Sequence, residues 1–125
     1  MPLIHPQQLT LGQLINLLHP IATSEPDRPV RFDFCRFEPY DFSSYRGYYE
    51  DLAIRPSENG MKTVGEFWTK LLACTGETFT GWKGGDYVAT PDTALWVSDL
   101  GEAHNTAIIG LLDRDEAAII QTAYA

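Results

Sequence analysis

The sequence is poor in the features that mark several common protein classes. It has two cysteines, Cys35 and Cys74, without CxxC spacing. We therefore expect two reduced thiols, with a bridge between them as the less favoured alternative. Its apolar runs are far shorter than the roughly 20 residues that cross a bilayer, and no basic stretch followed by an apolar run suggests a signal peptide. These absences predict a cytoplasmic protein without a membrane partner.

Basic residues are also scarce. Nine lysines and arginines face seventeen aspartates and glutamates, which gives a net charge of −8. Direct nucleic-acid binding is therefore not expected, because it normally requires a basic surface. The charge is compatible with a small-molecule binder, an enzyme or a protein that docks on a basic partner. The length and the 44% hydrophobic content fit a single globular domain over 1–125.

Two stretches have the pattern of capped, amphipathic helices. The first begins with a capping box over Thr10–Gln13 and is expected to end at His19-Pro20, because proline disfavours helix in the residue before it. The second begins with a capping box over Thr63–Glu66 and is expected to end at Gly76. The two starts, Thr-Leu-Gly-Gln and Thr-Val-Gly-Glu, look alike. This likeness suggests, without establishing, an internal duplication.

The remaining regular segments have the pattern of strands. Val30–Phe34 alternates strictly, so Val30, Phe32 and Phe34 are expected to face inward. The further segments are a turn around Glu38–Asp41, a strand over Ser44–Ile54, a loop over Arg55–Gly60, and strands over Thr78–Thr80, Tyr87–Thr90, Ala94–Ser98, Thr106–Leu112 and Ala117–Tyr124. Short links favour an antiparallel sheet of about six strands with two helices packed on one face. The predicted fold is α+β, in the order α-β-β-α-β-β-β-β.

Two segments, Ser44–Asp51 and Phe79–Tyr87, combine aromatic rings, glycines and a cation. Rings stack on a base, Arg and Lys meet phosphate, and glycines let the backbone approach a ligand closely. The residues predicted to bind a ligand are Tyr45, Arg46, Tyr48, Tyr49, Trp82, Lys83, Gly84, Gly85 and Tyr87. The alternative is that the tyrosines fill the core and that the glycines form a turn. The glycine-rich loop is not a P-loop, since it lacks the Lys-Ser/Thr ending and does not open a helix.

A third cluster, Asp99, Glu102 and His104, has side chains that can bind a metal or transfer protons. Its spacing matches no metal motif, and a solvated loop is the favoured interpretation. The sequence also lacks GxSxG and HExxH motifs, so a nucleophilic hydrolase is poorly supported. We expect no metal and no cofactor.

The segments Ser44–Tyr49 (SYRGYY) and Thr78–Tyr87 (TFTGWKGGDY) carry a resemblance to known proteins. With them in view, the chain resembles small proteins of bacteria and their phages that have no assigned activity. Leu9–Leu14 and Leu95–Val97 also resemble parts of those proteins, so that the likeness covers most of the chain. It implies no catalytic residue. Its phage association implies an anti-defence role, by sequestering a nucleotide immune signal or by binding a defence protein directly.

These observations favour non-enzymatic binding of a small nucleotide-derived ligand, as a phage-encoded sponge for a host immune signal in the host cytoplasm. Sponges gain from sites between subunits, so at least a homodimer is expected. One alternative is an acidic inhibitor of the anti-CRISPR or anti-restriction type that binds a host defence nuclease. The acids that motivate it are Glu38, Asp41, Glu50, Asp51, Asp113, Asp115 and Glu116. The other alternative is a metal-assisted phosphodiesterase that uses Asp99, Glu102 and His104.

Overall fold

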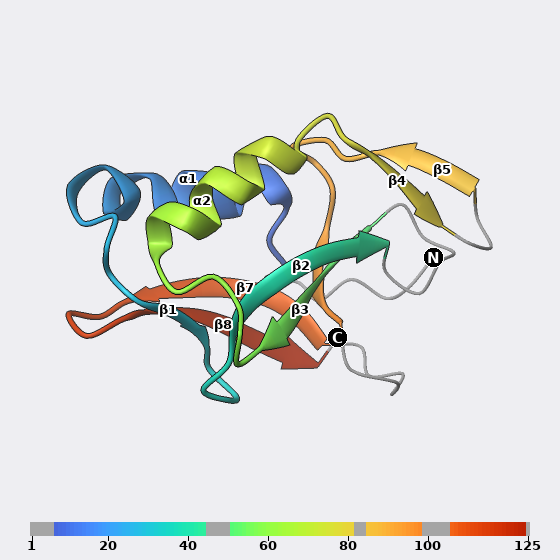
Figure 1. Ribbon diagram of the computed structural model, residues 1–125. Helices are drawn as coiled ribbons and strands as arrows, with labels where there is room; N and C mark the ends of the chain where they lie inside the picture. Colours follow the sequence, from blue (N-terminus) through green and yellow to red (C-terminus); the bar gives the residue numbers. More distant parts are fainter. Residues whose placement is uncertain (1–6, 45–50, 82–84, 99–105, 125) are drawn as a thin grey trace.

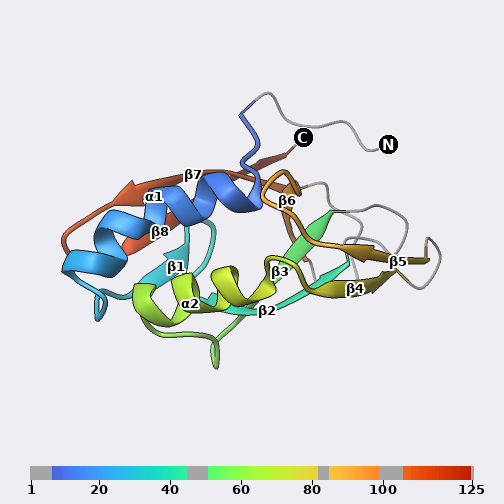
Figure 2. The ribbon, with the colours of Figure 1, turned by 90° about the horizontal axis from the view of Figure 1, so that it is seen from above.

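The computed structural model describes residues 7–44, 51–81, 85–98 and 106–124. Two helices lie side by side over one face of a curved six-stranded sheet, and a two-stranded hairpin extends beyond one end of the helical layer (Figures 1 and 2). The elements are α1 Leu11–Ser24, β1 Val30–Phe32, β2 Glu38–Ser44, β3 Leu52–Ser57, α2 Val64–Cys74, β4 Thr78–Gly81, β5 Gly85–Val88, β6 Leu95–Val97, β7 Thr106–Asp113 and β8 Ala118–Tyr124. The predicted α+β class, the six-stranded sheet and the two helices on one face are confirmed. Three strands lie between the helices and five follow the second helix.

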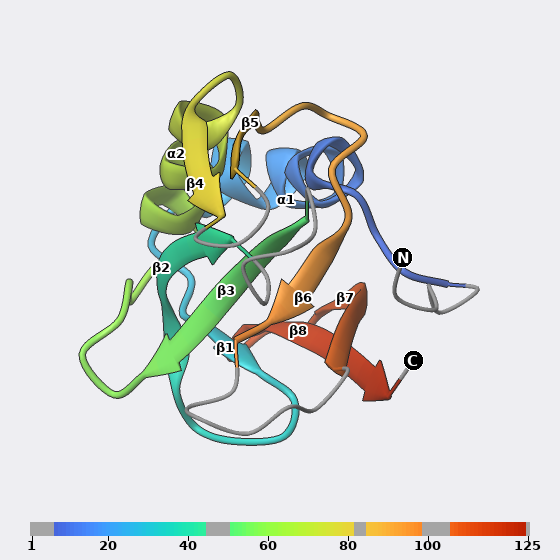
Figure 3. The same ribbon diagram turned by 90° about the vertical axis from the view of Figure 1, so that its right-hand side faces the viewer.

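The large sheet is mixed, and the prediction of a purely antiparallel sheet was wrong. Its order is β1-β8-β7-β6-β3-β2, with β1 parallel to β8 and β3 parallel to β6. The chain leaves β3, forms α2 and the β4–β5 hairpin, and returns as β6, which is the long crossover that parallel neighbours require. Phe32 N–H donates to the carbonyl of Phe37, at 3.2 Å, just before β2. This contact brings the two edges of the sheet together and makes it barrel-like (Figure 3).

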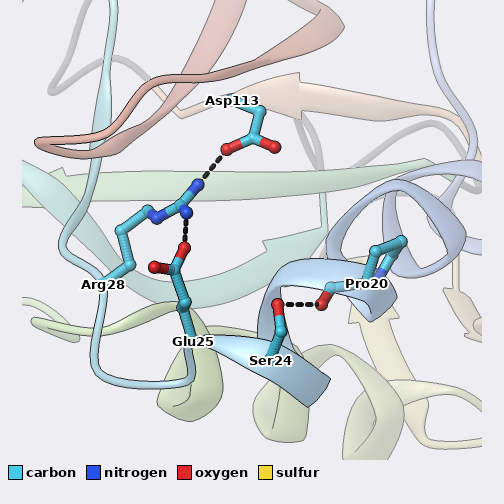
Figure 4. Close-up of polar contacts among 5 residues, drawn as sticks. All are labelled: Pro20, Ser24, Glu25, Arg28 and Asp113. Atoms are coloured by element: carbon cyan, nitrogen blue, oxygen red, sulfur yellow. Dashed lines mark hydrogen bonds and ion pairs between the residues drawn. The ribbon is translucent and has the colours of Figure 1, made fainter.

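Helix α1 starts at the predicted capping box but does not end at Pro20. It continues to Ser24, because Ile21 packs in the core. The hydroxyls of Thr23 and Ser24 donate to the carbonyls of His19 and Pro20, each at 2.8 Å, so polar side chains satisfy the last turn. Figure 4 shows the Ser24 contact. Burial of the last turn therefore outweighs the local effect of proline.

Helix α2 follows its prediction closely. The Thr63 hydroxyl accepts from the N–H of Glu66 at 3.2 Å, and the helix ends at Cys74. Gly76, with φ of 91°, takes the left-handed conformation that suits a residue after a helix end. Among the described residues, no helix is long and apolar enough to cross a membrane.

Four predicted boundaries in the first half of the chain were wrong. The expected strand Ser44–Ile54 is not one strand, because β2 ends at Ser44, Asp51 lies outside any strand and β3 begins at Leu52. The expected turn at Glu38–Asp41 is the start of β2, which tolerates Pro39 because β2 is the last strand in the sheet order and its register shifts between Pro39 and Asp41. The expected loop at Arg55–Gly60 contains the end of β3. Phe34, expected to face inward, lies beyond the end of β1 and is 53% exposed. Val30 and Phe32 are buried as predicted.

The hydrophobic core lies between the helices and the sheet. Its large, fully buried members are Leu11, Leu14, Leu18, Phe32, Leu52, Ile54, Phe67, Leu71, Leu95, Ile108 and Ile120. A smaller cluster of Ala53, Trp96 and Ala107 forms a second buried group, against which Ile109 packs. Since Ala53 and Trp96 alternate with the core residues of β3 and β6, this cluster occupies the opposite face of the sheet.

Arg28 links the connection after α1 to the far end of β7. Its guanidinium forms ion pairs with Glu25 and Asp113 (Figure 4). Asp113 is the last residue of β7, so this bridge joins the end of the β7–β8 hairpin to the helical layer. The predicted hairpin connection at Asp113–Glu116 is confirmed, with β7 and β8 antiparallel on either side of it.

The two halves of the chain repeat one arrangement, as the similar helix starts suggested. Gly12 N–H donates to the carbonyl of Pro91 and Gly65 N–H to that of Pro26, both at 2.9 Å. A Cβ at Gly12 would lie 2.9 Å from the Pro91 Cβ, and one at Gly65 would lie 3.1 Å from the Pro26 Cβ, so both positions favour glycine. The strands repeat as well. The first residue of β1 pairs with the first residue of β8, and the first residue of β6 pairs in the same way with the first residue of β3. The pairs β2–β3 and β7–β8 are both antiparallel, and each contains a register shift. The structure therefore supports two α-β-β-β units, α1-β1-β2-β3 and α2-β6-β7-β8, with the β4–β5 hairpin inserted after the helix of the second unit.

Candidate functional site

Most of the predicted ligand-binding residues lie outside the described part of the chain. Tyr45, Arg46, Tyr48 and Tyr49 belong to the connection between β2 and β3, and Trp82, Lys83 and Gly84 to the connection between β4 and β5. Asp99, Glu102 and His104 belong to the connection between β6 and β7 and also lie outside the described residues. Gly85 begins β5, and Tyr87 lies within it.

Tyr87 occupies a largely buried position in the β4–β5 hairpin. It pairs with Phe79 across the hairpin, and the two rings stack with their centroids 6.1 Å apart. The side chain of Tyr87 is only 8% exposed. Its ring thus packs against protein on at least one side, which leaves little of it available to a ligand. In the structure, Tyr87 contributes to the packing of the β4–β5 hairpin through its contact with Phe79.

Asp51 connects the flanks of the two predicted segments. The Tyr87 hydroxyl donates to the backbone carbonyl of Asp51 at 2.6 Å. The indole Nε1 of the fully buried Trp96 donates to the Asp51 carboxylate Oδ2 at 2.9 Å. Asp51 is the first described residue after the segment 45–50, and Tyr87 lies two residues after the start of β5. The end of the first aromatic segment is therefore held against the hairpin that carries the second.

The part played by Trp96 was missed from the sequence. Trp96 was predicted only as part of the strand Ala94–Ser98, and the partner of its indole lies 45 residues away in the chain. One signal was present, because a buried tryptophan normally needs an acceptor for its N–H. The sequence alone could not identify that acceptor among seventeen acids.

A cleft of about 420 Å³ opens at one end of the sheet and was not predicted. Its walls are Asp33, Phe34, Pro56, Val97, Thr106, Thr122 and Ala123. These residues come from the carboxyl ends of β1, β3, β6 and β8 and from the start of β7. The four strands run in the same direction, so the two repeated units contribute equivalent ends to the cleft.

Asp33 shapes this cleft. Its Oδ2 accepts from the Thr122 N–H at 2.9 Å, and its Oδ1 accepts from the Thr122 hydroxyl at 2.6 Å. In the other half of the chain, the position equivalent to Thr122 of β8 is Pro56 of β3, which has no backbone N–H to donate. The carboxylate thus fixes the end of β8 on one side, and the two halves differ where they meet at the cleft.

The thiols carry no evident chemistry. Both cysteines are free. Burial raises the pKa of Cys74 to about 12, and burial also raises the pKa of Cys35, with a smaller contribution from the nearby Asp33 and Glu38 charges. Neither thiol is therefore activated as a nucleophile. Within the described ranges, no group of three His, Cys, Asp or Glu residues could hold a metal ion.

Comparisons of the chain with protein-family models, curated proteins and solved structures gave no match.

Proposed function

We propose that this protein binds a small nucleotide-derived ligand without turning it over, at a site built from the segments Tyr45–Tyr49 and Trp82–Gly85. The observation that supports the proposal is the contact between Tyr87 and Asp51, at 2.6 Å. Because this hydrogen bond joins the described flanks of both segments, it restricts how far the segments can separate. The rings and cations that the sequence places in each segment would then serve one ligand.

The chemistry of the segments suits a nucleotide. Tyr45, Tyr48, Tyr49 and Trp82 would stack on a base, and Arg46 and Lys83 would meet phosphate. Glycine at positions 84 and 85 would let backbone amides approach the anion closely. The positive charge would be local to the site although the chain as a whole is acidic.

The proposed biological role is a phage-encoded sponge that sequesters a host immune signal in the host cytoplasm. Sequestration needs tight binding rather than catalysis. It is compatible with two thiols whose raised pKa values leave them unactivated as nucleophiles. A homo-oligomer would suit the role, since each subunit could add groups to a neighbour's site.

The alternative of an acidic inhibitor of a host defence nuclease receives less support from the charges. Three of the acids that motivate it are engaged within the chain: Glu38 with Lys62, Asp41 with Arg55 at 3.0 Å, and Asp113 with Arg28. Asp51 accepts from Trp96. Among the described residues of that set, Asp115 and Glu116 remain exposed without an ion pair. This leaves a small acidic surface for a basic partner.

Calorimetry against a panel of linear and cyclic nucleotides tests the proposal. We expect one class to bind, and we expect Trp82→Ala and Arg46→Ala each to weaken that binding at least tenfold, as loss of a stacking or charge-assisted contact of about 1.4 kcal/mol or more requires. Arg114→Ala is the matched control, because it removes one positive charge from an exposed turn. Absence of binding across the panel, or equal binding by all three variants, would refute the proposed site.

A further inference from the structure

A groove along β1 contains two arginines that have no ion-pair partner among the described residues. Arg31 of β1 and Arg36 of the following bend line a cavity of about 800 Å³, together with Phe34, Leu112 and Ile119. Ile119 lies opposite both Arg31 and Leu112 in the sheet register, so the groove crosses β1, β8 and β7. Arg31 alternates with the core residues Val30 and Phe32, which places it on the sheet face away from the helices.

Arg31 and Arg36 share one groove, whereas Lys70 and Arg114, which also lack an ion pair among the described residues, are exposed and do not line it. Arg28, Arg55 and Lys62 each form an ion pair with a carboxylate. Within the described residues, neither Arg31 nor Arg36 does so, although the chain has a large excess of acids. Two cations that share one groove without partners repel each other, and an anion between them would relieve that repulsion.

The acids nearest the groove are directed to other groups. Both oxygens of Asp33 accept hydrogen bonds from Thr122, at 2.9 and 2.6 Å. Glu38 forms its ion pair with Lys62. Asp33 keeps its negative charge and lines the groove, but two arginines outnumber this one carboxylate, so the net charge of the described lining is positive.

The groove continues into the cleft at the carboxyl ends of the strands. The two cavities share Asp33 and Phe34. The Phe34 ring is 53% exposed, and its centroid lies 5.4 Å from that of the fully buried Phe32. One side of the ring is thus supported by the core, while much of its surface is open to a ligand. The mouths of barrel-like sheets are recurrent ligand-binding positions.

We propose that the groove and the adjoining cleft together form one binding site, the rim site. It would bind a phosphate-bearing aromatic molecule, with the phosphate between Arg31 and Arg36 and the ring on Phe34 at the cleft entrance. The Thr106 hydroxyl at the cleft would meet a polar group of the ring system. The site goes beyond the function proposed above, because it lies at the other end of β3. The segment 45–50 precedes Leu52, the first residue of β3, whereas the cleft begins near Pro56.

Titration of the full-length protein with adenosine monophosphate, pyrophosphate and adenosine, followed by amide NMR shifts, tests this site. We expect adenosine monophosphate to shift amides of residues 31–36, 112 and 119. The double variant Arg31→Gln, Arg36→Gln should lower its affinity at least tenfold, because two charge-assisted contacts are lost. Phe34→Leu should lower the affinity for adenosine monophosphate about fivefold and leave pyrophosphate binding unchanged, since only the ring contact is lost.

Lys70→Gln is the matched control, because it removes one positive charge from an exposed position of α2, on the opposite face of the sheet. It should leave all affinities within about twofold. Shifts confined to residues near Asp51 and Tyr87 would overturn the rim site and support the first proposed site instead. Equal affinity of the double arginine variant and the Lys70→Gln control would also overturn the rim site. Because Arg36 is exposed, Arg36→Gln alone preserves the fold and should already weaken binding of adenosine monophosphate.

Discussion

Tyr87→Phe tests the contact on which the first proposed site depends. The substitution keeps the ring that stacks on Phe79 and removes only the hydroxyl that donates to the Asp51 carbonyl. A buried hydrogen bond contributes about 1 kcal/mol, and leaving an acceptor without its donor adds about another 1 kcal/mol. We therefore expect the free energy of unfolding to fall by about 2 kcal/mol. With a urea slope of about 2 kcal/mol per molar, the midpoint of unfolding should fall by about 1 M.

Tyr40→Phe provides the matched control for this experiment. Tyr40 is 42% exposed and its ring faces the Arg55 guanidinium at 4.9 Å. Its hydroxyl makes no hydrogen bond within the described part of the chain, so its loss should change stability by less than about 0.5 kcal/mol. Urea titrations followed by tryptophan fluorescence measure both variants. If the urea midpoint of Tyr87→Phe lies within about 0.2 M of that of Tyr40→Phe, the contact does not hold the two segments together.

Two further predictions concern Gly60 and Cys74. A Cβ at Gly60 would lie 2.6 Å from the Pro39 carbonyl oxygen and 2.7 Å from that of Glu38. Gly60→Ala should therefore displace β2 and lower the urea-derived free energy of unfolding by about 2 kcal/mol. An unchanged free energy of unfolding would show that β2 shifts at little cost. The folded pKa of Cys74 is raised from 9.0 to about 12, so stability from this group is complete below pH 9 and is lost as the pH rises toward 12. Urea midpoints between pH 8 and 11 should fall more steeply for the wild type than for Cys74→Ala, and parallel profiles would contradict the assigned pKa.

The helices could be predicted from the sequence because their signals are local. Thr10 and Thr63 are followed three residues later by Gln13 and Glu66, and the structure places both threonines at helix starts. The end of α1 was predicted less well, because Ile21 gains burial in a core that a local pattern does not reveal. A cap is decided within one turn, whereas a helix end can be decided by distant residues.

The sheet could be predicted only in part, because its pairing is not local. The β7–β8 hairpin was predicted, since its strands are joined by a short polar turn. The parallel pairs were not, because the partners of Val30 and Leu52 are Ala118 and Leu95. The alternation of Val30–Phe34 likewise could not show that β1 ends at Phe32 and that Phe34 would be exposed.

The candidate sites divide in the same way. The two aromatic segments were found by composition, and Tyr87 and Asp51 then proved to touch. The groove of Arg31 and Arg36 could not be found by composition, because an overall charge of −8 does not show that two arginines lie in one groove without an ion pair to any described residue. Only the fold shows that neighbouring acids are engaged elsewhere.

We propose that the protein holds a phosphate-bearing aromatic molecule without altering it. The most direct measurement incubates the purified protein with a nucleotide mixture, removes unbound molecules by gel filtration, and identifies by mass spectrometry what denaturation releases. We predict that one nucleotide class is recovered intact and that less of it is recovered from Trp82→Ala or from the double variant of Arg31 and Arg36. Recovery of no nucleotide would contradict binding. Recovery of a cleaved product, abolished by chelator, would contradict simple sequestration and favour a metal-assisted phosphodiesterase.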